Sequence, residues 1–200
     1  MLDRTIPFYN LILRCDRYTP TEAALPENFQ LRKFQTGDER AWGALEHTIG
    51  DFPSCDLAER YFAATYCKDR AEAEKRCFFA VNADRKIVGT CTAWRDNRGG
   101  ETVSSLHWLA VDPAYQGQGL GKALCQKTME FFQNAGEFPV YIHTQPWSCK
   151  AVFLYLRQGF ILQKTDTFSE YRNQYDQAMA ALEKVLTERQ YEDLLRHSAP

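Results

Sequence analysis

A glycine-rich run in the middle of the chain, from Gln116 to Lys122, is the feature that most limits what this sequence can fold into. It follows an apolar segment that ends at Val111, and it opens a stretch whose apolar residues recur at helical spacing. A strand, a glycine-rich turn and a helix in this order bind phosphate groups. Glycine lets the backbone approach an anion, and the first turn of a helix presents unpaired N–H groups. The sequence therefore predicts a phosphate-bearing ligand at this loop.

Two common phosphate motifs do not fit the spacing of these glycines. A P-loop needs four residues between its glycines and a Ser or Thr after its lysine. Here three residues separate Gly117 from Gly121, and Ala123 follows Lys122. The dinucleotide fingerprint also fails, because a single residue lies between Gly119 and Gly121 where that motif has two. Three glycines at alternate positions exceed what a helix cap requires, so a ligand site is favoured over a cap.

A second motif follows farther along the chain. Ser148, Ala151 and Tyr155 are spaced i, i+3 and i+7, which places them on one face of a predicted helix that ends at Gly159. Ser148 is the predicted N-cap of this helix. Strands are predicted on either side of it, over Val140–Thr144 and from Phe160 to Lys164.

These two motifs together resemble those of one family. Gln116-x-x-Gly119-x-Gly121 is similar to the acyl-CoA pyrophosphate loop of the GNAT superfamily of N-acyltransferases. The second block resembles the GNAT signature N-x-x-A-x-x-x-Y-x-x-x-G-F, with Ser148 in place of the usual Asn and with matches at Ala151, Tyr155, Gly159 and Phe160. The resemblance covers roughly residues 29–162 in architecture and is specific from Leu106 to Phe160.

The resemblance implies acetyl-CoA as the cosubstrate and assigns roles along the chain. Tyr155 would protonate the departing CoA thiolate, and Ser148 would hydrogen-bond the pantetheine arm with one polar group in place of an amide's two. A backbone N–H at the strand end 109–111 would polarise the thioester carbonyl. The residues expected to bind acetyl-CoA are Leu109, Ala110, Val111, Gln116, Gly117, Gln118, Gly119, Leu120, Gly121, Lys122, Ser148 and Ala151.

The catalytic base is predicted at His107, because an imidazole accepts protons at neutral pH. Many GNAT members place a Glu on this strand, and none occurs between Thr102 and Val111. A histidine at the same spacing to the strand end occurs in arylalkylamine acyltransferases of this superfamily. Strand alternation predicts that His107 shares a face with Val111, with Trp108 on the opposite face. The alternatives are a water chain to solvent, or a histidine that only bonds within the sheet.

The pattern of elements predicts an α/β fold of the α+β type, with a mixed, mostly antiparallel central sheet, helices on both faces and a C-terminal helical tail. One domain is expected overall: an N-terminal arm over 1–27 that packs on the domain, a GNAT-like core over 28–165 and a helical extension over 166–200. The predicted strands before the loop are 8–13, 29–34, 77–81, 86–95 and 102–111; the predicted helices are 38–49 and 55–67; a linker is predicted over 20–26. In the tail, apolar residues from Tyr171 to Val185 recur at helical spacing and pack on the domain or, alternatively, form a homodimer contact. The N-terminal strand either fills the place of the family's last strand, or the sheet is shorter.

Composition argues against several classes of partner. A net charge of −2 with dispersed basic residues argues against nucleic acid, and no apolar run reaches the roughly 20 residues of a membrane span. The N-terminus does not read as a signal peptide, and the seven cysteines form no C-x-x-C pair, so a cytoplasmic protein with reduced thiols is expected. The four histidines form no local cluster, so no metal site is predicted.

These inferences lead to one function with two alternatives. The predicted activity is transfer of an acetyl group from acetyl-CoA to a primary amine of a small molecule by direct attack. The alternatives are a protein or peptide N-acetyltransferase and a non-catalytic module that senses acyl-CoA. The candidate walls of the acceptor pocket are the aromatic residues Phe52, Tyr61, Phe62, Trp94, Trp108 and Trp147.

Overall fold

The computed structural model describes residues 3–20 and 25–199 of the chain. Its helices are α1 (Glu39–Ile49), α2 (Cys55–Thr65), α3 (Arg70–Arg76), α4 (Leu120–Ala135), α5 (Cys149–Arg157), α6 (Tyr175–Glu183) and α7 (Glu188–Arg196). Its strands are β1 (Leu11–Cys15), β2 (Phe29–Lys33), β3 (Cys77–Asn82), β4 (Ile87–Arg98), β5 (Glu101–Val111), β6 (Val140–Thr144), β7 (Ile161–Gln163) and β8 (Ser198–Ala199). Residues 21–24 of the predicted linker lie outside the described residues.

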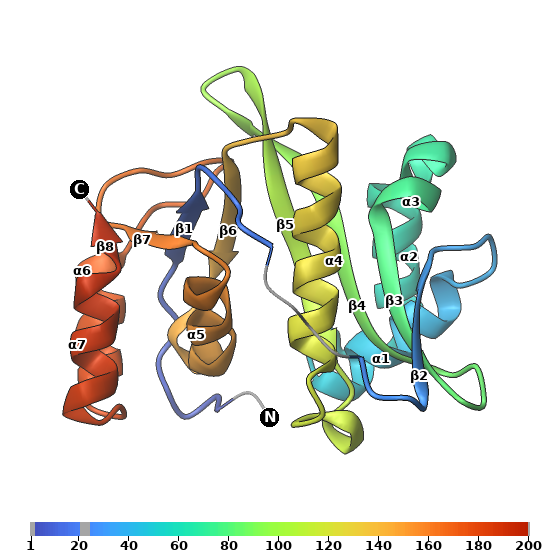
Figure 1. Ribbon diagram of the computed structural model, residues 1–200, viewed down its shortest axis with the longest axis horizontal. Coiled ribbons are helices and arrows are strands. Elements are labelled where there is room, and N and C mark those ends of the chain that lie inside the picture. The colour runs from blue at the N-terminus through green and yellow to red at the C-terminus, as the bar shows by residue number, and fades with distance from the viewer. Residues whose placement is uncertain (1–2, 21–24, 200) are drawn as a thin grey trace. The chain divides into compact units, whose positions relative to one another are not determined.

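The strands are hydrogen-bonded in the order β2-β3-β4-β5-β6-β1-β7-β8 (Figure 1). β5 and β6 are parallel, as are β7 and β8, whereas β1 is antiparallel to both of its neighbours. The predicted mixed, mostly antiparallel sheet is therefore confirmed. The N-terminal arm supplies a strand of that sheet, because β1 lies between β6 and β7.

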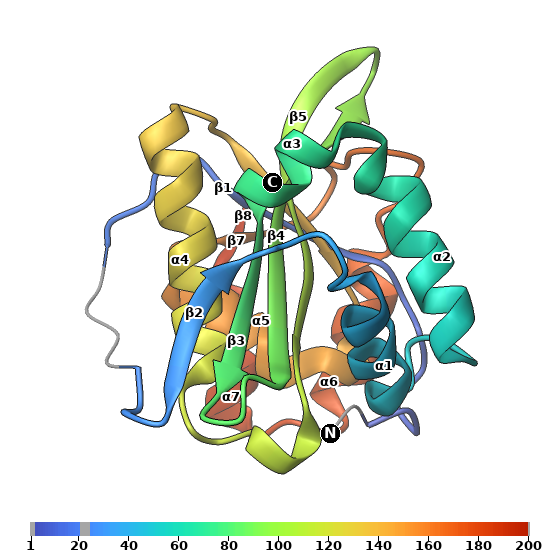
Figure 2. The same cartoon turned by 90° about the vertical axis from the view of Figure 1, so that its right-hand side faces the viewer.

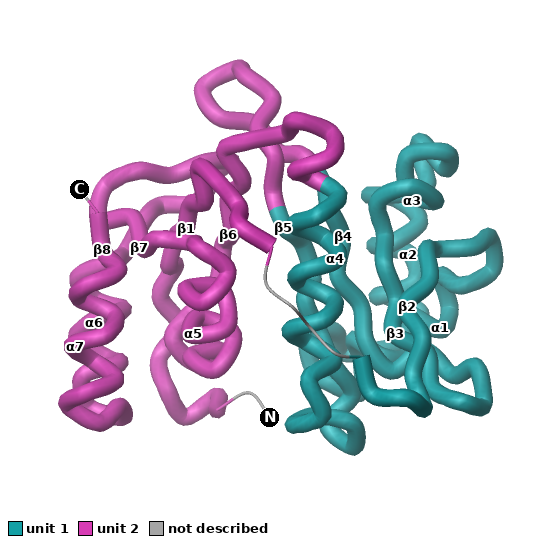
Figure 3. The backbone as a smooth tube through the Cα atoms, in the orientation of Figure 1, with its two compact units in different colours: residues 1, 21–94, 106–131 teal, residues 2–20, 95–105, 132–200 magenta. Residues whose placement is uncertain are grey.

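The chain divides into two compact units (Figure 3). Among the described residues, the first unit holds 25–94 and 106–131, and the second holds 3–20, 95–105 and 132–199. β4 and β5 each contribute residues to both units, and each unit is described by itself below. The expectation of one domain overall stays a prediction.

Strand alternation in β3 shows how helices cover both faces of the sheet in the first unit. The ring of Phe78 lies 6.0 Å from that of Phe131 on α4. The next residue, Phe79, points the other way and packs with Phe34, Trp42 and other residues of the core cluster that α1 and α2 cover. Helices α1 and α2 thus lie on one face and α4 on the other (Figure 2), as predicted.

One glycine and one hydroxyl explain the end of α1 and the start of α2, and a second glycine explains how closely the two helices pack. Gly50 has a φ of +91° and ends α1, a conformation that glycine adopts without a Cβ clash. The side chain of Ser54 accepts a hydrogen bond of 3.2 Å from the backbone N–H of Leu57 and so caps α2. A Cβ on Gly43 would lie 2.7 Å from the carbonyl oxygen of Cys55, so the two helices pack with almost no space between them at this point.

Two early elements differ from their predictions. The strand predicted over 8–13 was wrong in its bounds, because β1 runs from Leu11, opposite Thr144, to Cys15, opposite Val140. Helix α3 was not predicted, because a short, highly charged segment carries little hydrophobic periodicity. The side chain of Asp69, which accepts the backbone N–H of Glu72, caps it locally.

The first helix of the tail begins later than its apolar pattern indicates. Tyr171 was predicted as helical, whereas α6 begins at Tyr175. Asn173 explains the difference, because its side chain donates to the carbonyls of Gln163 and Asp166 and accepts from the backbone N–H of Tyr175. Such side-chain bonds compete with helix formation. The aromatic ring of Tyr171 instead stacks on that of His143, with a centroid distance of 3.7 Å, and the buried stripe of the tail is made by Tyr175, Ala178 and Leu182.

One carboxylate ties the segment after β7 to the strands of the second unit. Asp166 accepts hydrogen bonds from Arg98 at 2.6 Å, from the Tyr141 hydroxyl at 3.0 Å and from Arg14 at 3.3 Å. It therefore connects the tail to β4, β6 and β1. Burial works to raise the pKa of Asp166, but the hydrogen bonds from Arg98 and Tyr141 outweigh burial and hold the pKa below its ordinary value.

We predict that Asp166→Asn lowers the free energy of unfolding by about 1–3 kcal/mol at neutral pH, because it weakens charge-assisted hydrogen bonds. The lowered pKa of Asp166 means that its stabilisation is present above the unfolded-state pKa of about 3.9 and is lost as the pH falls through the folded-state value. The difference between wild type and variant should therefore shrink in strong acid. Urea denaturation at several pH values measures the free energy of unfolding of both proteins. Asp84→Asn is the control, because Asp84 is an exposed turn residue. A deficit that stays constant down to the lowest pH would contradict this assignment.

Candidate functional site

The glycine-rich loop of the first unit has the backbone geometry that its sequence predicts. Gly117 and Gly119 have φ values of +80° and +84°, in the left-handed region, and no atom lies within 4 Å of a Cβ built on either residue. The carbonyl of Gly119 accepts the N–H of Ala123 at 3.0 Å, so α4 begins directly after it. Left-handed turns before a helix orient backbone N–H groups toward a common point, which is an arrangement that binds anions.

The loop is anchored to the end of β5 by two side chains. The amide of Gln116 donates to the carbonyl of Val111 at 3.0 Å. Asp112, almost fully buried, accepts the backbone N–H of Ala114 at 3.0 Å and pairs with the Lys86 ammonium at 3.0 Å. The sequence indicated a turn here, and the structure shows in addition that the carboxylate of Asp112 fixes where that turn begins.

Strand β5 departs from regular alternation at Trp108, whose φ is +50°. A bulky residue in this region is a strained outlier. The Tyr66 hydroxyl lies 2.9 Å from Nδ1 of His107, and Nε1 of Trp108 donates a long hydrogen bond of 3.4 Å to the Tyr61 hydroxyl. Both side chains therefore contact the layer formed by α1 and α2. The prediction that His107 and Trp108 lie on opposite faces was wrong, because the positive φ reverses the alternation.

The predicted strand end 109–111 follows this irregularity directly. Leu109, Ala110 and Val111 are all half-buried. The parallel ladder between β5 and β6 lies upstream, with Ser104 opposite Val140 and Ser105 opposite Tyr141. The role of this strand end toward a thioester carbonyl stays a prediction.

Six aromatic rings pack together under α1 and α2, and we call them the aromatic layer: Trp42, Phe52, Tyr61, Tyr66, Trp94 and Trp108. Trp42 and Tyr66 are fully buried, and the other four are half-buried. The ring of Trp108 lies 5.7 Å from that of Trp42 and 5.3 Å from that of Phe52. Four of the six predicted pocket walls thus lie in this layer.

The other two predicted walls differ from these four. Phe62 is fully buried in the hydrophobic core of the first unit, where its ring lies 5.0 Å from those of Trp42 and Tyr66. Trp147 belongs to the second unit, where its ring meets that of Phe8 edge-on at 5.2 Å and lies under the guanidinium of Arg4. Aromatic composition alone does not distinguish such core and surface positions from a pocket wall.

Glu46 is an acidic residue of this region that the sequence reasoning missed. It lies one helical turn after Trp42 on α1, is fully buried, and neither carboxyl oxygen has a hydrogen-bond partner among the described residues. Burial, with the nearby charge of Asp51, raises the pKa of Glu46 well above its ordinary value. The signal was present in the sequence, since Glu46 lies within the apolar stripe of Trp42, Leu45 and Ile49.

In the second unit, α5 carries the predicted face of Ser148, Ala151 and Tyr155. Ser148 occupies the N-cap position, but its hydroxyl accepts the side-chain amide of Gln145 at 2.9 Å, and the predicted side-chain cap of the helix is not formed. Tyr155 is buried, and its ring is packed edge-on against Phe160 at 6.0 Å. The structure thus shows where these residues lie, and their roles stay predictions.

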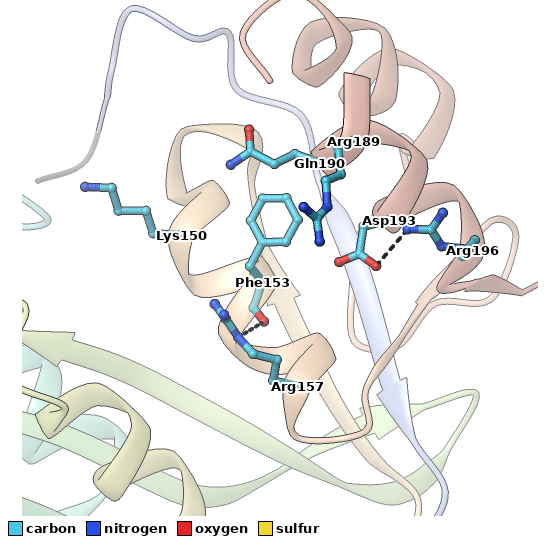
Figure 4. A pocket seen from close by; sticks show the side chains of 7 residues that line it. All are labelled: Lys150, Phe153, Arg157, Arg189, Gln190, Asp193 and Arg196. Carbon is cyan, nitrogen blue, oxygen red and sulfur yellow. Dashed lines mark hydrogen bonds and ion pairs between the residues drawn. The ribbon is translucent and has the colours of Figure 1, made fainter. Parts of the chain in front are cut away.

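The opposite side of α5 faces α7 across a basic cavity of about 590 Å³ (Figure 4). It is lined by Lys150, Phe153, Arg157, Arg189, Gln190, Asp193 and Arg196. Asp193 pairs with Arg196 at 3.4 Å. No predicted site residue lines this cavity, and its exposed charges come from two helices that the sequence places far apart.

Metal-binding clusters and membrane-spanning helices are both missing from the described residues. Within residues 3–20 and 25–199, no three His, Cys, Asp or Glu side chains are grouped so that they could hold a metal ion. In the same part of the chain, no helix has the length and apolar character needed to cross a bilayer. The cytoplasmic location stays a prediction.

Comparison with known proteins identifies the family. Residues 21–160 match the profile described as the acetyltransferase (GNAT) family. The chain belongs to this family. A mycothiol acetyltransferase of Arthrobacter sp. (strain FB24) is 32% identical over 144 residues, which cover 70% of this chain and 44% of that protein. N-acetyltransferase 8B of Rattus norvegicus is 31% identical over 115 residues, covering 56% of this chain and 48% of the relative. The chain therefore spans about half the length of these curated relatives.

Solved structures agree with the GNAT fold. A GCN5-related N-acetyltransferase from Sphaerobacter thermophilus matches with a TM-score of 0.59 and 24% identity, over 78% of this chain and 48% of that one. Glucosamine-6-phosphate N-acetyltransferase from Arabidopsis thaliana matches with a TM-score of 0.54 and 18% identity, over 74% of this chain and 100% of that one. These likenesses confirm the predicted fold.

We predict that Gly119→Ala weakens the binding of CoA about tenfold or more, because a Cβ disfavours the φ of +84° that orients the loop N–H groups. Gly99→Ala is the matched control, since Gly99 also has a positive φ and open space around it but lies in the β4–β5 hairpin. Calorimetric titration with CoA measures the affinity, and the melting temperature of each variant shows whether the substitution also destabilises the fold. Equal affinities of the two variants for CoA would show that the loop does not hold the ligand.

Proposed function

We propose that this protein transfers an acetyl group from acetyl-CoA to a primary amine of a small molecule by direct attack. The observation that carries the proposal is the loop of Gly117 and Gly119, left-handed at both glycines and directly followed by a 16-residue helix, in a chain of the GNAT family. The loop would hold the pyrophosphate of CoA through backbone N–H groups, with Lys122 adding a positive charge at the start of α4.

The amine must lose a proton to complete its attack, and we assign this proton to His107. For Nε2 of the imidazole to accept it, the Nδ1–H must donate to the Tyr66 hydroxyl oxygen, and the separation of 2.9 Å allows this. The buried phenol thus fixes the orientation of the ring. Tyr66 acts through His107 and is a positioning residue.

The remaining steps concern the thioester. As the bond from nitrogen to the acetyl carbon forms, the carbonyl oxygen gains charge that a backbone N–H at 109–111 would stabilise. When the carbon–sulfur bond breaks, the electron pair goes to sulfur and Tyr155 supplies the proton. Ser148 and Ala151, on the same helix, would line the pantetheine arm. These assignments rest on the motif and on the position of each residue in its own unit.

A small acceptor is favoured over a peptide by the aromatic layer, because its packed rings offer apolar walls at β5. The curated relatives named mycothiol acetyltransferase carry a small molecule in their name, which supports the same choice. A panel of small amines and of peptide N-termini decides it, with thiol release from acetyl-CoA as the readout. Turnover of peptides alone would favour the protein acetyltransferase, and tight CoA binding without any turnover would favour a sensor module.

We predict that Tyr155→Phe lowers kcat by about 10²- to 10⁴-fold, the usual contribution of a general acid, with little change in the KM for acetyl-CoA. Tyr141→Phe is the control, because it removes a buried phenol that bonds Asp166 and has no part in the proposed chemistry. Thiol release under steady-state conditions is the measurement. If Tyr155→Phe keeps the wild-type kcat, Tyr155 is not the acid.

We predict that His107→Gln lowers kcat at neutral pH and that the loss is partly recovered at high pH, where more of the amine is already deprotonated. Tyr66→Phe should shift the pH profile of kcat in the same direction by a smaller amount, because it removes the hydrogen bond at Nδ1 and leaves the imidazole in place. Rate–pH profiles of the three proteins test this assignment. Superimposable profiles of wild type and His107→Gln would favour a water chain as the proton acceptor.

A further inference from the structure

Several buried side chains of the first unit carry polar atoms with no hydrogen-bond partner among the described residues, and three of them share one region. These three are Glu46, through both carboxyl oxygens, Trp42, through Nε1, and Thr90, through its hydroxyl. All three residues have no exposed surface. A buried polar atom without a partner costs about 1–3 kcal/mol, so such groups are rare and their clustering calls for a physical reason.

These three side chains face the same layer of the protein. Trp42 and Glu46 are four residues apart on α1 and therefore share a helix face. Thr90 lies opposite Phe79 in the β3–β4 ladder, and residues that are paired in this way point to the same side of a sheet. Phe79 belongs to the core cluster beneath α1 and α2. The unpartnered groups therefore lie in the layer that also contains the aromatic rings.

The half-buried rings of this layer provide a second, independent feature. Tyr61 stacks on Trp42 with an interplanar angle of 15°. The ring of Phe52 lies 5.3 Å from the rings of both Tyr61 and Trp108, and the rings of Tyr61 and Trp108 are 5.4 Å apart. Aromatic faces attract cations, most strongly when water is excluded. Trp108 is also the neighbour of His107, the proposed base. Glu46 lies one helical turn after Trp42, whose ring contacts those of Phe52, Tyr61 and Trp108. A buried carboxyl and aromatic faces in one layer are a combination that recognises a positive charge.

We propose that Glu46, together with the half-buried rings of the aromatic layer, binds a second, non-reacting positive charge of the acceptor, so that the preferred substrates are amines with two cationic groups. This inference rests on the proposed acetyltransferase function and names its acceptor class. Without ligand, Glu46 is held neutral by burial. When the cationic group binds at the half-buried rings and reaches Glu46, the carboxyl loses its proton to solvent and forms a charge-assisted hydrogen bond with the cation.

The test compares 1,4-diaminobutane with butylamine, which have the same carbon chain and differ in one charge. Wild type should show a kcat/KM for the diamine about 10- to 100-fold above that for the monoamine at saturating acetyl-CoA, the range that a charge-assisted hydrogen bond supplies. In Glu46→Gln the ratio should fall toward one. Asp51→Asn is the control, because Asp51 is an exposed carboxylate close to Glu46, and this variant should keep the wild-type ratio.

Several outcomes would overturn the inference. These are a wild-type ratio near one, a ratio that survives Glu46→Gln, and a ratio that is lost in Asp51→Asn instead. If Glu46→Gln does not fold, Glu46→Met is the second variant, and the wild-type ratio decides by itself when neither folds. If no amine releases thiol, the proposed function fails. Calorimetric binding of 1,4-diaminobutane to wild type and Glu46→Gln then tests the inference separately, and equal affinities would overturn it.

Discussion

The left-handed backbone of Trp108 is the constraint on which the aromatic layer, the proposed acceptor site, depends. Its φ of +50° is unfavourable for a bulky residue, and it persists because the surrounding contacts hold it. These contacts are the Tyr66 hydroxyl at His107 and the rings of Trp42 and Phe52 at Trp108. The irregularity turns two consecutive side chains toward α1 and α2. The strained backbone and the packing of the aromatic layer therefore meet at one residue, Trp108.

Strand β5 serves both substrates of the proposed reaction within the first unit. Its irregular middle presents His107 to the layer beneath α1 and α2, and its end at Val111 is tied by Gln116 to the loop that opens α4. Because α4 covers the opposite face of the sheet, the strand joins a donor loop on one side to an acceptor layer on the other. A change in the backbone of β5 would affect both.

Hydrophobic periodicity and turn residues were sufficient to predict the order of most elements, as α1 between Asp38 and Gly50 shows. These sequence signals failed where local contacts or an unusual backbone conformation change the regular pattern of a helix or strand. Asn173 delays the first tail helix, and Trp108 reverses the alternation that was expected around His107. Glu46 was missed for a different reason: its place in the apolar stripe of α1 is visible in the sequence, but the lack of a hydrogen-bond partner for its carboxyl among the described residues is visible only in the structure. Motif spacing predicted the loop that is proposed to bind the donor, whereas the aromatic layer could be recognised only from the structure.

The contact at Gly43 has a consequence for how this fold can change. The backbones of α1 and α2 already touch there, with 2.7 Å between a Cβ position and the carbonyl oxygen of Cys55. The distance between α1 and α2 is therefore fixed at this point. Descendants of this protein that bind bulkier acceptors would gain room through smaller side chains in the aromatic layer, while the distance between α1 and α2 stays the same.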